Sequence, residues 1–441
     1  MAGHASEKND YDTAVDKSDA RAPSEFTLRS YLATAGAALS YFVTVGLLNA
    51  FGIFQEYYQS TLIPDHTPFQ ISWLGTFPTF AVFLFAPAAG ILADKVGPTI
   101  PITAGSVLLL IAIFMISLCK TYWQLFLAQG VLMGVGMSFV AIPASGIVPA
   151  YFVKNRALVS GISVAGSSLG GVIWPIAFDQ MLHKDGISFA WSMRIGGFIM
   201  MPLLGICILT VKKPVKKPVT VPDEAGTSAS LDEATEKPAN ERPKTRAEHM
   251  KVLRTPPFLL LAAGLVVALF GFFTPFFYIS TYAVSLGMSP SLAFYFVSIV
   301  NGASLFGRVL PGIVADKWGR FNILVVSMAT AGVVAFCWTT ATSVAGLVVW
   351  TIAYGFASGA ILSLQIACST TLADASIASS AVGIIMGSTS LGGLFGSPIA
   401  GALLKHGYIA LACWSGSLLL AGAVLIGASR FVQDRRIMAR V

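Results

Sequence analysis

Residues 301–320 read NGASLFGRVLPGIVADKWGR, and this stretch decides how the rest of the chain is interpreted. It holds an arginine, Arg308, inside a long apolar run in which the next acidic residue is Asp316. Burying an unpaired charge is costly, so this arginine needs either a partner or a function. Which of the two applies depends on the surrounding protein.

The composition indicates a polytopic membrane protein. Of the 441 residues, 55% are hydrophobic and 11% are charged, whereas soluble domains carry about 25% charged residues. The net charge of +7 does not indicate a nucleic-acid partner, because the basic residues lie in short segments between apolar runs. The five cysteines have no metal-ligand spacing, so no metal site and no cofactor are predicted.

Twelve apolar runs are long enough for a membrane-spanning helix, which needs about 20 residues. Helices are the expected form, because lipid offers no hydrogen-bond partners to exposed backbone groups. We therefore predict an all-α membrane protein with twelve transmembrane helices. The runs are 31–57, 71–93, 100–119, 122–150, 157–182, 190–211, 258–286, 290–315, 322–340, 344–373, 379–404 and 408–430.

The basic residues predict the orientation. With both chain ends in the cytoplasm, the inner segments hold 23 of the 28 Lys and Arg residues, and the outer segments hold only Lys120, Lys184 and Lys405. Arg194 and Arg308 lie within helices. This asymmetry follows the positive-inside rule and favours cytoplasmic termini.

Five regions follow from these runs: a disordered cytoplasmic N-terminus (1–29), a six-helix half (30–211), a flexible cytoplasmic linker (212–257), a second six-helix half (258–430) and a short tail (431–441). The linker is charged, rich in proline and without apolar periodicity. Its opening KKPVKK either sets the topology or contacts anionic lipid.

The two halves repeat each other. GILADKVGP at 90–98 matches GIVADKWGR at 312–320, and GISVAGSSLGG at 161–171 matches GIIMGSTSLGG at 383–393. The two matches are displaced along the chain by the same offset, which indicates a duplicated unit in one orientation. Parallel halves of this kind build transporters whose substrate site lies near the membrane midplane, between the halves.

These repeated residues resemble the major facilitator superfamily, whose loop signature is G-x-x-x-D-[RK]-x-G-[RK]. The second copy is complete, and the first has Pro98 at the last basic position. The resemblance implies the major facilitator fold and loops that latch the halves together. The alternative is that both copies are solvated turns. The predicted gating residues are Asp94, Lys95, Arg156, Asp316, Lys317 and Arg320.

Within that superfamily, YFVKNRALVSGISVAGSSLGG at 151–171 resembles the helix 5 segment of the monocarboxylate porter family, and LLNAFGIFQEYY at 47–58 resembles its fungal members. The resemblance implies transport of a monocarboxylate-like anion. Two regions depart from the lactate carriers. Ser304 stands where those proteins have an aspartate, and Leu48 and Asn49 stand in the region where they have a lysine. Lactate-type proton coupling is therefore not carried over intact.

Asn301, Ser304 and Arg308 are spaced to share one helix face. Because guanidinium matches carboxylate geometry, we predict that an anionic substrate is the partner of Arg308. The alternative is that Arg308 caps backbone carbonyls or pairs with Glu56 or Asp179. The resemblance adds further candidates that line the central cavity of this fold, each of which is otherwise a packing residue. The predicted substrate-binding residues are Arg308, Asn49, Ser138, Tyr278, Asn301 and Gln365.

The resulting functional prediction is a secondary active transporter, functioning as a monomer, that moves a small organic acid through the cell membrane by alternating access. An organelle membrane is the alternative location. No histidine or carboxylate lies in the middle of a helix, so we expect any coupled proton to travel with the substrate. The alternative function is export of a fungal secondary metabolite or a drug-like compound. A nutrient sensor on the same fold is a remoter alternative, and no motif of an enzyme is present.

Overall fold

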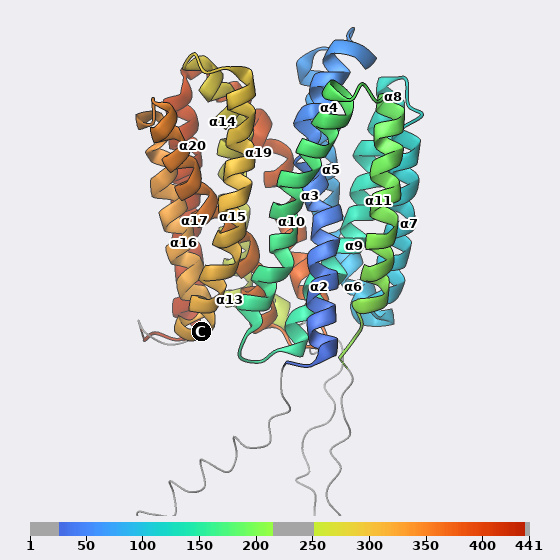
Figure 1. Ribbon diagram of the computed structural model, residues 1–441. Coiled ribbons are helices and arrows are strands. Elements are labelled where there is room, and N and C mark those ends of the chain that lie inside the picture. Colours follow the sequence, from blue (N-terminus) through green and yellow to red (C-terminus); the bar gives the residue numbers. More distant parts are fainter. Residues whose placement is uncertain (1–25, 215–250, 437–441) are drawn as a thin grey trace, which may run out of the picture.

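The computed structural model describes residues 26–214 and 251–436 (Figure 1). Most of the predicted N-terminal segment and linker, and the last residues of the tail, lie outside the described residues. The described residues form helices and no strand. α2 begins at Leu28, α11 ends at Thr210, α13 begins at Pro256 and α20 ends at Gln433.

The first half contains six helical spans, several of which are built from consecutive segments. They are α2 (Leu28–Val43), α3 (Val45–Leu48), α4 (Phe51–Tyr57) and η2 (Tyr58–Leu62); α5 (Pro68–Leu84) and α6 (Ala86–Val96); α7 (Thr99–Ile116); α8 (Tyr122–Leu125), η3 (Phe126–Met133), α9 (Gly134–Ile147) and η4 (Val148–Tyr151); α10 (Arg156–Asp179) and η5 (Gln180–Lys184); and α11 (Phe189–Thr210).

The second half repeats this organisation. It consists of η6 (Val252–Arg254), α13 (Pro256–Phe272) and α14 (Thr274–Ser285); α15 (Pro290–Trp318); α16 (Arg320–Phe336) and η7 (Trp338–Thr340); α17 (Val344–Leu372); α18 (Ala378–Ser388), α19 (Ser390–Leu403) and η8 (Leu404–His406); and α20 (Tyr408–Gln433).

Eleven of these spans are long and apolar enough to cross a membrane, and α16 is a shorter apolar helix. The predicted ninth run, 322–340, therefore gives a helix of only 17 residues. The helix ends where Trp338 is fully buried in a tight turn. At 1.5 Å per residue α16 is about 26 Å long, slightly less than the hydrocarbon thickness.

Short polar residues begin several helices. Thr27 and Thr67 each accept a hydrogen bond from the backbone N–H three residues later, at α2 and α5. Ser289 and Ser343 do the same at α15 and α17. These caps satisfy backbone donors that a helix N-terminus otherwise leaves unpaired, which matters most at the edge of a membrane.

The two copies of the loop signature turn in the same way. Gly97 follows α6 with a φ of 96°, and Gly319 follows α15 with a φ of 97°. Glycine adopts this region of φ without steric cost, whereas other residues are strained there. The equivalent glycines thus give the aspartates before them equivalent positions.

Several helix pairs join the halves, chiefly α10 with α15 and α6 with α18. A Cβ on Gly161 would lie 2.2 Å from the carbonyl oxygen of Arg308, and a Cβ on Gly383 would lie 2.3 Å from that of Ala86. In the sequence repeat Gly161 corresponds to Gly383, and Ala86 corresponds to Arg308. Close glycine-mediated packing is typical of helices in lipid, and here it occurs twice by internal symmetry.

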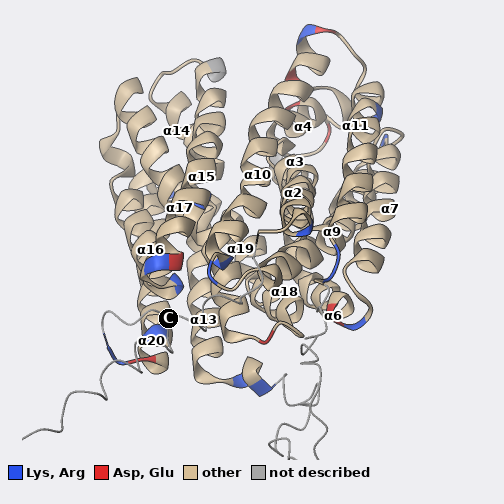
Figure 2. Ribbon diagram, turned by 60° about the horizontal axis from the view of Figure 1, so that its bottom comes forward, with Lys and Arg blue, Asp and Glu red and all other residues tan. Residues whose placement is uncertain are grey.

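The charged residues mark the ends of the bundle. Figure 2 shows Lys, Arg, Asp and Glu gathered at the end where the described chain begins and finishes, which we call the terminal end, and at the tips of the opposite end. Figure 1 shows the ribbons of the halves converging at the terminal end. The outer surface carries exposed apolar side chains such as Leu209, Val349 and Val424, as expected for contact with lipid.

Candidate functional site

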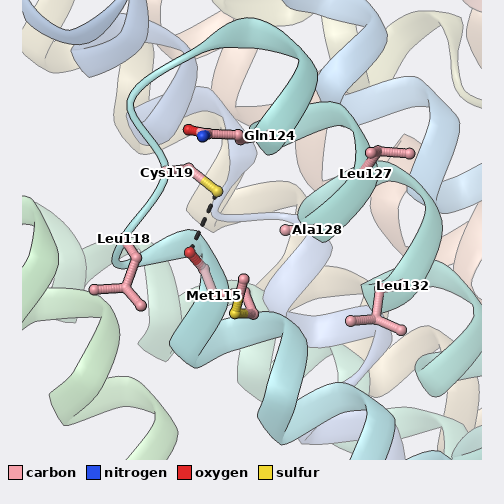
Figure 3. A pocket seen from close by; sticks show the side chains of 7 residues that line it. All are labelled: Met115, Leu118, Cys119, Gln124, Leu127, Ala128 and Leu132. Atoms are coloured by element: carbon pink, nitrogen blue, oxygen red, sulfur yellow. Dashed lines mark hydrogen bonds between the residues drawn. The ribbon is translucent and has the colours of Figure 1, made fainter.

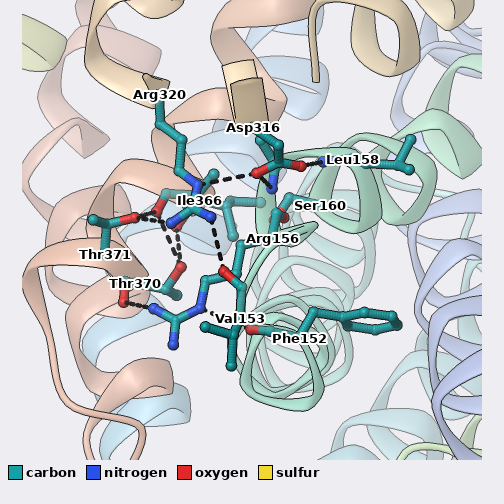
Figure 4. Close-up of polar contacts among 12 residues, drawn as sticks. Phe152, Val153, Arg156, Leu158, Ser160, Asp316, Arg320, Ile366, Thr370 and Thr371 are labelled. Atoms are coloured by element: carbon teal, nitrogen blue, oxygen red, sulfur yellow. Dashed lines mark hydrogen bonds and ion pairs between the residues drawn. The ribbon is translucent and has the colours of Figure 1, made fainter. Parts of the chain in front are cut away.

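Asp316, at the end of α15, caps the N-terminus of α10 from the other half (Figure 4). Its Oδ1 accepts from the backbone N–H of Ala157 at 3.0 Å, and its Oδ2 accepts from that of Leu158 at 2.9 Å. A carboxylate at a helix N-terminus satisfies unpaired donors and interacts favourably with the helix dipole. We call this contact and its arginine partners the α10 latch.

Two arginines reinforce the α10 latch. Arg320 Nε lies 3.1 Å from Asp316 Oδ1, while its Nη1 donates to Thr371 Oγ1 and its Nη2 donates to the carbonyl of Val153 across the interface (Figure 4). Arg156 Nη1 donates at 3.1 Å to the carbonyl of Thr370 in the other half. The ion pair is shielded, since the side chains of Asp316 and Arg320 are only 7% and 15% exposed.

Asp94 makes the equivalent contact with α18, which we call the α18 latch. Its Oδ1 accepts from the N–H of Ser379 at 3.2 Å, and its Oδ2 accepts from that of Ser380 at 2.7 Å. In the sequence repeat Ser379 and Ser380 are the equivalents of the two donors of the α10 latch. The backbone carbonyl of Asp94 also accepts a hydrogen bond from Lys213 Nζ at 3.0 Å.

Four of the six predicted gating residues form the two latches. Asp316, Arg320 and Arg156 meet at the α10 latch, and Asp94 forms the α18 latch. Within the described part of the chain, Lys95 and Lys317 are exposed and form no hydrogen bond or ion pair.

Arg308 lies buried between the halves, 4% exposed. Its Nη1 donates at 2.8 Å to the backbone carbonyl of Val164 on α10, and also donates to Ser167 Oγ. Its Nε is buried without a hydrogen-bond partner among the described residues. One side of the guanidinium therefore holds α10, and the Nε edge is unsatisfied.

No carboxylate of the described residues pairs with Arg308. Glu56, one acid considered from the sequence, is exposed. Asp179, the other, lies 3.0 Å from His183 Nδ1 and 3.8 Å from Lys184 Nζ. Arg308 therefore caps a backbone carbonyl through Nη1, which was one alternative drawn from the sequence. The other alternative, an ion pair with Glu56 or Asp179, is not formed in the described structure.

A buried tyrosine that the sequence interpretation missed lies beside the arginine. Tyr41 on α2 is 4% exposed, interacts electrostatically with Arg308, and its hydroxyl has no well-formed hydrogen bond in the described structure. Ser167 was also missed, although it lies in the repeated GSSLGG motif. Ser304 was expected to share the face of Arg308, but its Oγ lies toward Gly359 of α17.

Asn49 and Asn301 come together across the interface. A Cβ on Gly171 of α10 would lie 2.7 Å from Asn301 Oδ1 and 3.0 Å from Asn49 Nδ2, so both amides lie against this glycine. Asn49 is positioned by a break in the first span, between α3 and α4. These two predicted residues are thus neighbours although they come from different halves.

The remaining predicted binding residues make contacts within their own halves. Ser138 on α9 donates at 2.8 Å to the carbonyl of Val82 on α5. Tyr278 on α14 donates at 3.2 Å to the carbonyl of Ser397 on α19. Gln365 on α17 donates at 3.4 Å to the carbonyl of Leu362 in its own helix. The structure thus does not group these three with Arg308.

A separate depression lies between α7 and the start of the fourth span (Figure 3). Its lining includes Met115, Leu118 and Leu127, which are exposed on the outer surface. Cys119 contributes a thiol that donates to the carbonyl of Met115. The depression therefore faces the lipid side of the first half, away from the interface that holds Arg308.

Comparison with known proteins agrees with this architecture. Residues 31–375 match the family model described as Major Facilitator Superfamily. The chain is 44% identical to the agnestins efflux protein AgnL12 of Paecilomyces divaricatus, over 91% of this chain and 87% of that protein. It is 36% identical to the aspyridones efflux protein apdF of Emericella nidulans, over 92% and 78% of the two chains.

The fold also matches a solved transporter. The crystal structure of the E. coli fucose:proton symporter FucP superposes with a TM-score of 0.65 at 15% identity, covering 91% of this chain and 99% of that chain. The predicted major facilitator fold is therefore confirmed. The chain belongs to the major facilitator superfamily and is a multi-pass membrane transporter of a small molecule, not an enzyme.

Proposed function

We propose that the chain exports an acidic organic metabolite from the cytoplasm by alternating access. The observation that carries the proposal is Arg308, a buried cation between the halves whose Nε edge is unsatisfied and which has no carboxylate partner in the described structure. An arginine fork recognises planar anions such as carboxylates in two-point geometry. An acidic substrate is therefore its natural partner.

The direction of transport is supported by the names of the relatives. The agnestins and aspyridones proteins are named as efflux proteins of fungal products. These names favour export of a metabolite, the alternative drawn from the sequence, over transport of a small monocarboxylate. The narrower assignment to the monocarboxylate porter family remains a proposal that rests on residues 151–171.

The latches fit alternating access. The excess of basic residues supports placing the terminal end, and both chain ends, in the cytoplasm. Both latches are formed in this structure, so the described state is closed toward that side. Release of Asp94 and Asp316 from their helix N-termini would let the halves separate there and admit the metabolite to Arg308.

The membrane and the coupling ion belong to the same proposal. We place the chain in the cell membrane as a functional monomer. Because no carboxylate pairs with Arg308 in the described residues, the only acid at the site would be the substrate itself. A coupled proton would then cross with the substrate, as a neutral acid or opposite the arginine.

The test is transport into proteoliposomes of labelled aliphatic and aromatic acids, with and without a pH gradient. Arg308→Ala should abolish gradient-dependent accumulation, and Arg308→Lys should lower it about tenfold because lysine lacks the planar fork. Arg194→Ala is the matched control, since Arg194 lies within α11 of the first half and its Nε donates to Ser117 Oγ in that same half. Full pH-dependent transport by Arg308→Ala would overturn the proposal.

A further inference from the structure

We propose that the site selects acids that carry a second group, a hydrogen-bond donor, on the side remote from the acid. Arg308 would hold the acid group, and the amides of Asn49 and Asn301 would hold the donor. The proposal rests on the proposed function and adds the chemical class of the substrate. Three observations carry it: the held arginine, the two amide oxygens that accept no hydrogen bond from the described residues, and the spacing between them.

The arginine end is fixed in place. Nη1 is held by the Val164 carbonyl and by Ser167 Oγ, which places the guanidinium at the level of Ser167 on α10. The side chain leans toward the N-terminus of α15, as side chains on helices do, and so toward Asn301. The buried Nε is left for a ligand.

The amide end offers acceptors. Asn49 Nδ2 donates at 3.1 Å to the carbonyl of Val45, and Asn301 Nδ2 donates at 2.9 Å to that of Val297. Each amide is thereby oriented by its own helix. Within the described residues neither Oδ1 accepts a hydrogen bond, although Asn301 is only 2% exposed. A hydroxyl or N–H group of the substrate would satisfy these oxygens.

The distance between the arginine end and the amide end of the site can be estimated along α10. Ser167 marks the level of the guanidinium and Gly171 marks the level of the amides, both on α10. Four residues of α-helix rise about 6 Å, so the acid and the donor should be separated by roughly that distance. A short hydroxy acid carries its hydroxyl beside the carboxylate and reaches only one end of the site.

Three related acids test the spacing. Benzoate has no donor, 2-hydroxybenzoate has one beside the acid, and 4-hydroxybenzoate has one across the ring. We expect 4-hydroxybenzoate to bind the purified protein in nanodiscs about tenfold more tightly than the other two, since one added hydrogen bond to an otherwise unsatisfied group is worth about that factor. Titration calorimetry gives the three dissociation constants.

Variants assign the preference to residues. Asn301→Leu and Asn49→Leu should bring 4-hydroxybenzoate to the affinity of benzoate. Gly171→Ala leaves both amides in the sequence but displaces them, because its Cβ would lie 2.7 Å from Asn301 Oδ1. It should also lose the preference. Thr103→Val, on the exposed side of α7 and bonded only to its own helix, is the control and should keep it.

The outcomes separate this proposal from the proposed function. If the three acids bind equally to the native chain, or if the asparagine variants weaken all three equally, the second contact is absent and the inference is wrong while the acid site stands. If Arg308→Ala leaves binding of all three unchanged, the acid site itself is wrong, and the inference is overturned with it. A thermal unfolding scan of each variant identifies those that fail to fold.

Discussion

The two latches occupy equivalent positions in the duplicated halves but differ in their side-chain contacts. In both, a carboxylate accepts hydrogen bonds from two successive N–H groups at a helix start. The α10 latch adds Arg320 and Arg156, whose equivalents in the α18 latch are Pro98 and Ala378. Duplication has thus retained the carboxylate cap in both copies, while the arginine contacts occur in only one.

This difference indicates which interaction is needed to keep the halves closed at the terminal end. Capping by a carboxylate needs only backbone groups, so it survives changes of side chain in the partner helix. The arginines span both halves and depend on specific residues. We therefore expect the α10 latch to contribute more to the closed state, and the α18 latch to be the weaker of the two. Four substitutions test this ranking.

The largest effect is expected from Asp316→Asn. The substitution removes a charged acceptor of two backbone hydrogen bonds and leaves Arg320 without its ion-pair partner. Hydrogen bonds to charged groups contribute about 1.5–3 kcal/mol each, so the closed-to-open ratio should fall about 100-fold. Spin labels on the exposed equivalent positions Val96 and Trp318 would report the distance between the halves. An unchanged distance distribution would show that the α10 latch is dispensable.

Asp94→Asn should have the second largest effect. It weakens the cap on α18 but breaks no ion pair among the described residues. We expect the closed-to-open ratio to fall about 10- to 30-fold, measured with the same pair of labels. An effect larger than that of Asp316→Asn would reverse the ranking of the latches.

Arg320→Ala should convert the α10 latch into a copy of the α18 latch. The cap by Asp316 remains, while the ion pair and the contact with Val153 are lost. Because the pair is mostly buried, we expect a loss of about 1–1.4 kcal/mol, or about tenfold at most. In a double variant with Asp316→Asn, the two effects should not add, since both groups belong to one network.

The smallest effect is expected from Lys317→Ala. Lys317 is part of the loop signature, yet it is exposed and has no hydrogen bond or ion pair in the described residues. Surface charges of this kind contribute within about 0.5 kcal/mol, so the label distances and the transport rate should not change. A loss comparable to that of Arg320→Ala would mean that the lysine acts in the open state.

Much of the architecture could be predicted from residue patterns. Each of the twelve apolar runs corresponds to a helical span, and the sequence repeat recurs in equivalent glycine contacts between the halves. In the ninth span the α-helix ends at Phe336, earlier than expected, and a short 3-10 turn with the fully buried Trp338 follows it. Hydropathy reports where the chain meets lipid, but not where tertiary packing ends a helix.

The site could be predicted only in part. Arg308 stood out because a charge in an apolar run is rare, and Asn49 and Asn301 are neighbours in space as well as candidates in sequence. The other candidates were equally polar residues within apolar helices: Ser138, Tyr278 and Gln365. In the structure each of them forms its hydrogen bond within its own half. Tyr41 carried no signal, since a tyrosine in an apolar helix is ordinary until its hydroxyl is found buried beside a cation.

The sequence by itself determined the membrane class, the helical spans, the duplicated halves and the presence of an arginine, Arg308, inside an apolar run. These properties depend on composition, on periodicity and on the free energy of placing charge in lipid, all of which are local. Only the tertiary structure decided what each polar group contacts. The hydrogen-bond partners of Arg308, and the backbone N–H groups that Asp94 and Asp316 cap, lie far away along the chain in the opposite half, so they follow from how the halves pack.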